Sequence, residues 1–274
     1  MFRSLPFFLR WLSARGYTAL VLHFERMRVM DRITSRTNPR VQRARSLREG
    51  KYRKETGCHF VEGDKLVREA LSSGVKVETV FVREGYAGAV DFPCETLLVS
   101  DSVMDALSTA GTPQSLCAVA RTPALFLPEA FSGTVLLLED VQDPGNVGTL
   151  IRTADALGAS CVILSPQCAD PFSPKTLRSS MGSVYHLPVY TRDIPAALNI
   201  LNTQGYTCLC GHLRGSETLP PKTDKMALLV GNEGNGVTDA SAALCYPYRL
   251  PMSGRAESLN AAVFGAILLY ELLK

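Results

Sequence analysis

A chain of 274 residues is long enough to form one large domain or two domains of medium size. Hydrophobic residues make up 46% and charged residues 20%, a composition that is typical of globular proteins and excludes a disordered chain. The net charge is only +3, and no apolar run approaches the ~18 residues that a membrane-spanning helix needs, so the sequence predicts no membrane association.

Residues 1–30 differ in composition from the rest of the chain. From Met1 to Arg28 there are five arginines and only one acidic residue, Glu25, among apolar and aromatic residues. An acid-poor, amphipathic start of this kind is found in mitochondrial presequences. Met30 is the alternative first residue, and we interpret residues 1–30 as an extension that is either non-native or dispensable.

Residues 31–121 alternate helical and strand patterns, which predicts a small α/β domain. Asn38 and Pro39 are typical of a helix start, and Gly50 is expected to end that helix. Further expected elements are helices over Lys65–Leu71 and from Asp101 onward, and strands over His59–Val61, Val77–Val82, Thr96–Val99 and Cys117–Ala120.

The first part of this domain is strongly basic. Between Asp31 and Glu55 there are nine lysines and arginines against three acids, which favours a polyanionic partner, although a solvated helix face is the alternative. Arg40, Arg43 and Lys51 fall among the polar positions around the first helix. We therefore expect these three side chains to bind phosphates.

A segment rich in proline and small residues, 122–132, separates this domain from a second one at 133–274. The second domain again alternates strands and helices, a pattern typical of a parallel sheet covered by helices. In such sheets, ligands bind at the carboxyl ends of the strands. Strands are expected at 134–139, 161–164, 206–210, 226–231 and 247–250, and helices at 147–157, 174–180, 194–203 and 258–273, with a short helix after the fourth strand.

Three of these strands lead into loops that carry glycine or polar side chains. Glycine allows backbone N–H and C=O groups to approach a ligand closely. One such turn alone could be an ordinary surface turn, and a Ser or Asn could simply cap a helix, but three together predict a small-molecule pocket built mostly from backbone. The loops contain Asp143-Pro144-Gly145-Asn146-Val147-Gly148 followed by Arg152, then Gly231-Asn232-Glu233-Gly234, and finally Leu250-Pro251-Met252 followed by Ser258-Leu259-Asn260.

In order and spacing, the three segments resemble the sequence motifs of the SpoU/TrmH family of RNA 2′-O-ribose methyltransferases. Lys175 to Ser183 is also similar to this family, and the resemblance covers residues 133–274. It implies a SPOUT-type α/β domain with a C-terminal trefoil knot that pairs into a homodimer. It also implies that residues 31–121, with Phe60-Val61-Glu62-Gly63 as the first strand and turn, form a ribosomal-protein-like domain that binds the RNA substrate.

The resemblance further implies roles for individual residues. Arg152 would stabilise charge on the ribose oxygen or grip a phosphate, because a guanidinium is too basic to act as a simple base. The cofactor S-adenosylmethionine would be held by Gly211, Gly231, Leu250, Met252 and Leu259. Orientation of the ribose or the arginine, and ordering of the loops, would come from Asn146, Glu233, Ser258 and Asn260.

The sequence therefore predicts an S-adenosylmethionine-dependent RNA 2′-O-methyltransferase, and the N-terminal domain favours ribosomal RNA as the substrate. Two alternatives stay open, namely a methyltransferase of transfer RNA and a catalytically silent RNA-binding or ribosome-assembly protein. A methyltransferase of the dinucleotide-binding type would need a Gly-x-Gly-x-Gly loop after an early strand, which the sequence lacks.

The eight cysteines include no Cys-x-x-Cys pair, and several lie in apolar runs. This usage is typical of reduced, buried thiols in a cytoplasmic protein. Cys208, Cys210 and His212 lie close together in the sequence, but no second ligand pair occurs at the spacing of a zinc finger. We therefore expect them to be strand residues and predict no metal site.

Overall fold

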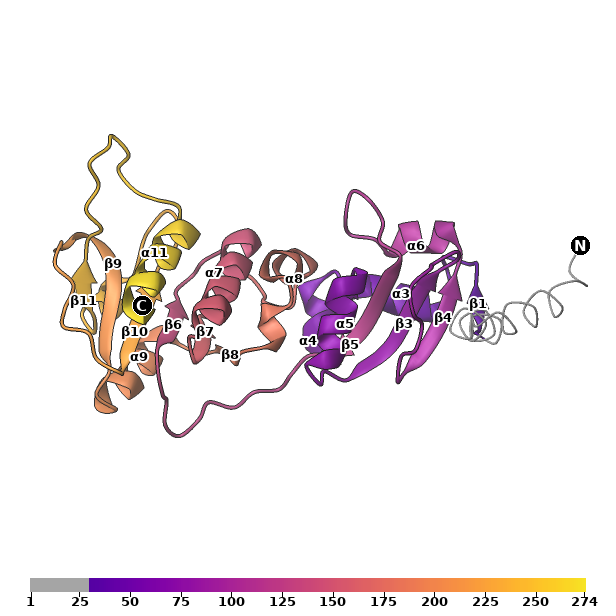
Figure 1. The fold of residues 1–274 in the computed structure, drawn as a ribbon, viewed down its shortest axis with the longest axis horizontal. Coiled ribbons are helices and arrows are strands. Elements are labelled where there is room, and N and C mark those ends of the chain that lie inside the picture. Colours follow the sequence, from indigo (N-terminus) through magenta and orange to yellow (C-terminus); the bar gives the residue numbers. More distant parts are fainter. Residues whose placement is uncertain (1–29) are drawn as a thin grey trace, which may run out of the picture. The chain divides into compact units, whose positions relative to one another are not determined.

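The computed structural model describes residues 30–274, so the expected N-terminal extension lies outside the described residues except for Met30. These residues form two compact units, one from residues 30–71 and 76–121 and the other mainly from residues 122–274. Figure 1 shows the elements of each unit coloured in chain order. No helix among residues 30–274 has the length and apolar character needed to cross a membrane.

The first unit combines a mixed sheet with helices. Its strands are β1 (Arg32–Ile33), β2 (Cys58–Glu62), β3 (Val77–Arg83), β4 (Glu95–Val99) and β5 (Leu116–Arg121), and its helices are α3 (Pro39–Ser46), α4 (Gly50–Thr56), α5 (Asp64–Ser72) and α6 (Asp101–Leu107). The strand order is β1-β4-β3-β5-β2. Strands β1, β4 and β3 run parallel, whereas β5 is antiparallel to both of its neighbours. A core of buried side chains that includes Phe60, Phe81 and Leu107 lies between this sheet and its helices.

The first helix is shorter than the sequence predicts. Asn38 caps α3 as expected, but α3 ends at Ser46. Gly50 then begins α4, so the prediction of one helix closed by Gly50 was wrong. The buried guanidinium of Arg53 stabilises the turn between the two helices, because its Nη1 atom donates to the carbonyls of Leu47 and Arg48.

The second unit is built around a sheet in which every pair of strands is parallel, as predicted. The strand order is β11-β9-β10-β6-β7-β8. The expected trefoil knot stays a prediction. The strands are β6 (Val135–Leu138), β7 (Cys161–Leu164), β8 (Val189–Thr191), β9 (Thr207–Ser216), β10 (Met226–Val230) and β11 (Tyr246–Tyr248), and the helices are α7 (Pro144–Leu157), α8 (Pro174–Ser180), the 3₁₀ helix η1 (Ser183–Tyr185), α9 (Ile194–Thr203), α10 (Asp239–Ala242) and α11 (Ala261–Leu273).

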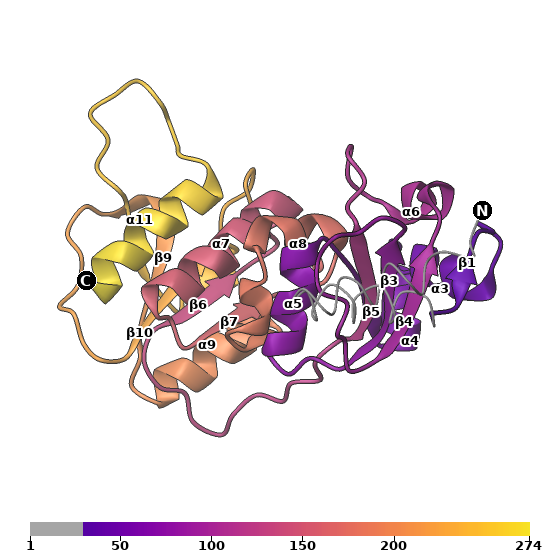
Figure 2. The same ribbon diagram turned by 45° about the vertical axis from the view of Figure 1, so that its right-hand side comes forward.

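Helices cover both faces of this sheet, because alternate residues of each buried strand point to opposite sides. Leu136 and Leu138 of β6 join a core with α7 and α11, whereas Val135 and Leu137 join a core with α9. Figure 2 shows α7 and α11 side by side on the same face of the sheet.

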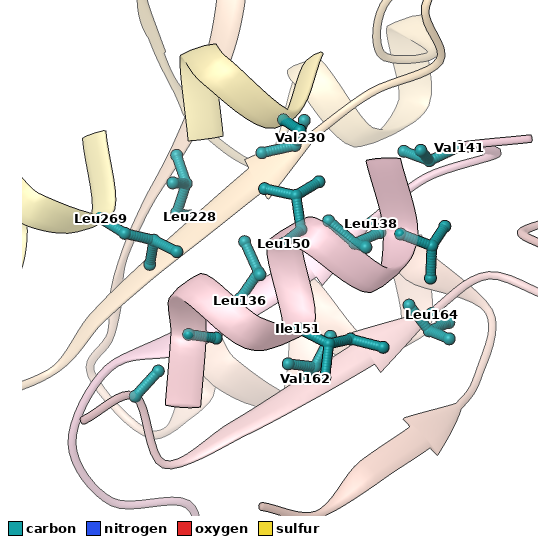
Figure 3. Packing of buried hydrophobic residues seen from close by; sticks show 14 of the residues in the cluster. Leu136, Leu138, Val141, Leu150, Ile151, Val162, Leu164, Leu228, Val230 and Leu269 are labelled. Atoms are coloured by element: carbon teal, nitrogen blue, oxygen red, sulfur yellow. The ribbon is translucent and has the colours of Figure 1, made fainter. Parts of the chain in front are cut away.

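The packing of α7 and α11 is close. In Figure 3, Leu150 of α7 extends toward the strands, and Leu269 of α11 lies near Leu228 of β10. A Cβ atom at Gly265 of α11 would overlap Cδ2 of Leu150, so a larger residue at this position would displace the Leu150 side chain.

Several elements differ from the sequence prediction. The last helix was expected from residue 258 but begins at Ala261, because Asn260 has a non-helical backbone and caps α11 with its side chain. The strand expected at 206–210 continues to Ser216, and the short elements β1, β8 and η1 were not predicted.

Candidate active site

The three glycine or polar loops meet at one edge of the second sheet. Strands β6 and β10 are neighbours, with Leu138 opposite Val230, and each strand leads directly into one of the loops. The third loop, residues 249–260, runs from β11 to α11. All three loops therefore lie at the carboxyl ends of parallel strands, where α/β sheets bind their ligands.

A chain of hydrogen bonds joins the three loops. Glu233 Oε1 accepts from Asn146 Nδ2 at 2.9 Å, and the same carboxylate accepts from the backbone N–H groups of Gln142 and Asp143, each at 3.3 Å. Asn260 Nδ2 in turn donates to Asn146 Oδ1 at 3.1 Å. The structure thus brings together three of the five residues that the sequence analysis named as catalytic.

Two carboxylates of this site are held in the ionised form. Burial of the Glu233 carboxylate opposes ionisation, but hydrogen bonds from Asn146 and from backbone N–H groups outweigh it and lower its pKa. The pKa of Asp143 is also lowered, chiefly by the hydrogen bond that Lys175 Nζ donates at 2.9 Å. At neutral pH both groups therefore only accept hydrogen bonds.

Two residues that the sequence analysis did not single out hold the loop after β10 in place. Glu139 is almost fully buried, and its carboxylate accepts from the backbone and hydroxyl groups of Thr238 and from the hydroxyl of Ser241. Asn232 Nδ2 donates to the carbonyl of Asp140 at 2.8 Å. The sequence could have indicated Glu139, because it is an acid that directly follows an apolar strand. A buried acid in such a place needs hydrogen-bond partners.

The glycines expected to border the cofactor also have structural roles. A Cβ atom at Gly231 would overlap the carbonyl of Gly236 and lie 2.5 Å from the backbone nitrogen of Val237, so Gly231 allows the loop to close on itself. A Cβ atom at Gly211 would lie 2.6 Å from the ring of Phe264. Contact of either glycine with a cofactor stays a prediction.

Arg152 lies apart from the hydrogen-bonded network. It lines a hollow of about 460 Å³ on the surface of α7, α8 and α11, together with Thr149, Ser179, Ala266 and Tyr270. Within residues 30–274 its guanidinium forms no hydrogen bond or ion pair. Its donors are therefore free to bind a ligand or a second protein chain.

The loop from residue 250 to residue 260 carries the remaining candidates. Leu250 packs partly against the core. Met252 and Leu259 are each 37% exposed, and Ser258 is exposed as well. The described residues include no group of three or more side chains suited to hold a metal ion, and Cys208 and Cys210 are buried strand residues.

The basic residues expected to bind RNA are mostly engaged by acids. Arg40 Nη2 lies 2.7 Å from Glu95 Oε1, and Arg43 Nη2 lies 2.6 Å from Glu78 Oε2. Lys51 Nζ is 3.9 Å from the nearest carboxylate oxygen of Glu55. Of the three, Lys51 is the residue most available to a phosphate.

The fold and the joined loops define a known class of protein. The family model of the SpoU rRNA methylase family matches residues 133–270, and the model of the MRM3-like substrate binding domain matches residues 38–118. The chain belongs to the SpoU rRNA methylase family.

Individual members are similar to the chain over nearly its whole length. The 23S rRNA (guanosine(2553)-2′-O)-methyltransferase RlmP of Bacillus subtilis (strain 168) is 38% identical over 251 residues, which are 89% of this chain and 99% of the relative. An AdoMet-bound rRNA methyltransferase from Sinorhizobium meliloti is 34% identical with a TM-score of 0.79, covering 89% of this chain and 97% of that chain. The SpoU methyltransferase AviRb from Streptomyces viridochromogenes, in complex with AdoMet, is 28% identical with a TM-score of 0.78, covering 86% and 97%.

Proposed function

We propose that this protein transfers a methyl group from S-adenosylmethionine to a ribose 2′-hydroxyl of ribosomal RNA. The proposal rests on the hydrogen-bonded network of Asn146, Glu233 and Asn260, which joins three loops at the carboxyl edge of a parallel sheet. Membership of the SpoU family, the rRNA 2′-O-methyltransferase RlmP and the two AdoMet-bound structures support it.

The chemistry of the third loop fits S-adenosylmethionine, which supplies an electrophilic methyl group on its sulfur atom. Residues 251–260 are all exposed, so this loop is open to a ligand from solvent. Met252 and Leu259 offer partly exposed apolar side chains that an adenine ring would cover. Leu250, Gly231 and Gly211 complete the proposed binding set.

In the proposed reaction, Arg152 acts on the RNA. Its guanidinium stays protonated, and its five donors can stabilise charge on the ribose oxygen or bind a neighbouring phosphate. Asn146 and Asn260 orient the ribose, while Glu233 fixes Asn146 and Ser258 helps to order the loop. Such alignment of two reactants can lower the barrier by ~7–11 kcal/mol.

The protein is further proposed to act as a homodimer in the cytoplasm. Val263, Ile267 and Tyr270 are 48%, 37% and 56% exposed and recur at helical spacing on one face of α11. This face lies beside the hollow that Arg152 lines, so a second copy would cover apolar surface close to Arg152. The eight free cysteines suit a reducing compartment.

Transfer of a labelled methyl group to purified ribosomal RNA tests this function. Ribose methylation is read as resistance of one phosphodiester bond to alkaline cleavage, because the reaction needs a free 2′-hydroxyl. Asn146→Ala should lose the transfer. A label found on a base, or only on transfer RNA, would contradict the proposal.

A further inference from the structure

Lys175 contacts the hydrogen-bonded network from outside the three loops. It lies in the first turn of α8, and its Nζ atom is 2.9 Å from Asp143 Oδ2. We propose that Lys175, through its ion pair with Asp143, is a positioning residue for methyl transfer. This inference rests on the proposed function, which leaves Lys175 without a role.

Asp143 connects Lys175 to the catalytic network. Its second carboxylate oxygen, Oδ1, caps α7 by accepting from the backbone N–H of Asn146 at 2.9 Å. The backbone N–H of Asp143 donates to Glu233 Oε1, the same oxygen that accepts from the Asn146 side chain. A shift of Asp143 therefore moves both the backbone of Asn146 and a donor to Glu233.

Close packing of α8 on α7 fixes the position of Lys175. A Cβ atom at Gly148 of α7 would overlap the Ser179 hydroxyl and lie 2.7 Å from the carbonyl of Thr176, so the two helices touch at this glycine. Ser179 Oγ also donates to the carbonyl of Pro144 at 3.0 Å. The first turn of α7 is thus held by α8, and Lys175 reaches Asp143 from a helix that packs directly on α7.

Because the Lys175–Asp143 ion pair is exposed, its effect on the reaction rate can be distinguished from an effect on folding stability. The side chains of Lys175 and Asp143 are 59% and 46% exposed, and ion pairs as exposed as this one add little to folding stability. Small displacements of reacting groups, in contrast, can lower a rate by ~100-fold. Loss of the pair should therefore leave a folded enzyme that binds both substrates but transfers methyl more slowly.

The test compares Lys175→Met, Asp143→Asn and the double variant. Asn caps helices as well as Asp does, so Asp143→Asn keeps the cap and removes only the charge. Each single variant should lower kcat by ~10-fold without changing the Kd for S-adenosylmethionine or the KM for RNA. The double variant should be no slower than the singles, because both changes remove one interaction. Lys175→Arg should restore most of the rate.

Lys225→Met is the matched control. Lys225 is also exposed, and its Nζ atom donates to the carbonyl of Gln204 at 2.8 Å. Because Lys225 directly precedes β10, it lies at the amino end of the sheet, away from the three loops. Its kcat should equal that of the wild type. If Lys175 instead contacts RNA, Lys175→Met would raise the KM for RNA while Asp143→Asn would leave kcat unchanged, which overturns the positioning role. Additive losses in the double variant, or an unchanged kcat in Lys175→Met, would overturn it as well.

A second readout does not depend on methyl transfer. The side-chain NH₂ signals of Asn146 and Asn260 in NMR spectra should shift in Lys175→Met and stay in place in Lys225→Met. Unmoved signals in Lys175→Met would overturn the inference. If the signals shift in Lys175→Met but the wild-type protein transfers no methyl group, the proposed function is overturned while the positioning contact stays supported.

Discussion

Asn146 shows how an ionised neighbour can set the orientation of an amide side chain. The Glu233 carboxylate can only accept hydrogen bonds, so Asn146 has to present its NH₂ group to Glu233. Its oxygen is then left for Asn260, whose NH₂ group donates to it. The charge of Glu233 thereby fixes the Asn146 amide. The cap of α11 orients the Asn260 amide to match it, because Asn260 Oδ1 accepts from the backbone N–H groups of Ala262 and Val263.

At the same scale, Arg152→Ala should abolish most methyl transfer while leaving cofactor affinity unchanged. Arg152 lies apart from the loop proposed to hold S-adenosylmethionine, and loss of one donor to developing charge typically lowers kcat by ~10²–10³-fold. Single-turnover kinetics and calorimetry measure the two effects separately. Arg192→Ala, a change at an exposed arginine just after β8, is the control. A near wild-type rate in Arg152→Ala would remove Arg152 from the catalytic set.

Gly231 and Gly234, in the loop after β10, allow the same substitution to be compared for its effect on folding stability. In Gly231→Ala the new Cβ atom would overlap the backbone of Gly236, whereas in Gly234→Ala the nearest atom is Asn232 Oδ1 at 3.6 Å. Gly231→Ala should therefore lower the free energy of unfolding by roughly 1–3 kcal/mol, as forced overpacking does, and weaken cofactor binding. Gly234→Ala should change neither. Equal melting temperatures for the two variants would show that the loop accommodates the clash.

At the scale of the element, local signals predicted the second unit well. Helix α7 has ordinary helix signals at both ends, with Asp143 as its cap, Pro144 in its first turn and Gly158 in the left-handed conformation at its end. It was nevertheless expected only from residue 147, so its first turn was assigned to the preceding loop. Buried strands such as β6 and β10 were predicted to within one residue because they are short apolar runs followed by glycine or polar loops.

Interactions between residues distant in the sequence set the limit of these predictions. Phosphate binding by Arg40 and Arg43 stays a prediction, but the structure also pairs them with Glu95 and Glu78, on strands that are distant in the sequence. No local pattern could indicate those pairs. Likewise, the three-residue strand β8 is too short for periodicity to identify.

The structure changes which basic residues are expected to bind RNA. Among residues 30–274, no carboxylate pairs with Arg45 or Lys54, and Lys51 is only loosely paired. Replacing these three residues by Gln should reduce the slope of log K against log salt concentration by about 2, because each phosphate contact on a single strand contributes ~0.7. Filter binding at several salt concentrations measures the slope.

The double variant Arg40→Gln/Arg43→Gln is the comparison for the variant of Arg45, Lys51 and Lys54. Its arginines already have carboxylate partners, so the salt slope should change less than in the variant of Arg45, Lys51 and Lys54. A larger change in the comparison variant would show that the RNA displaces Glu95 and Glu78 and uses the residues named from the sequence.

At the scale of the whole molecule, the exposed face of α11 is the feature that the single chain leaves unexplained. Helix α11 buries Leu268, Leu269 and Leu272 against the sheet, yet it also presents apolar side chains to solvent. Apolar surface that is gathered on one helix face marks an interaction site more often than scattered exposed residues do. A second copy of the chain is the partner that we propose for this face.

Ile267→Glu on α11 should therefore convert the proposed dimer into a monomer, because a charge buried in an apolar interface lacks a partner. Ile200→Glu on α9 is the control, since Ile267 and Ile200 are 37% and 39% exposed on opposite faces of the sheet. Light scattering should give the mass of two 29.8 kDa chains for the wild type and for Ile200→Glu, and of one chain for Ile267→Glu. If Arg152 acts at the subunit contact, the monomeric Ile267→Glu variant should also lose methyl transfer. A wild-type protein that is monomeric at micromolar concentration would reject the dimer and confine the active site to a single chain.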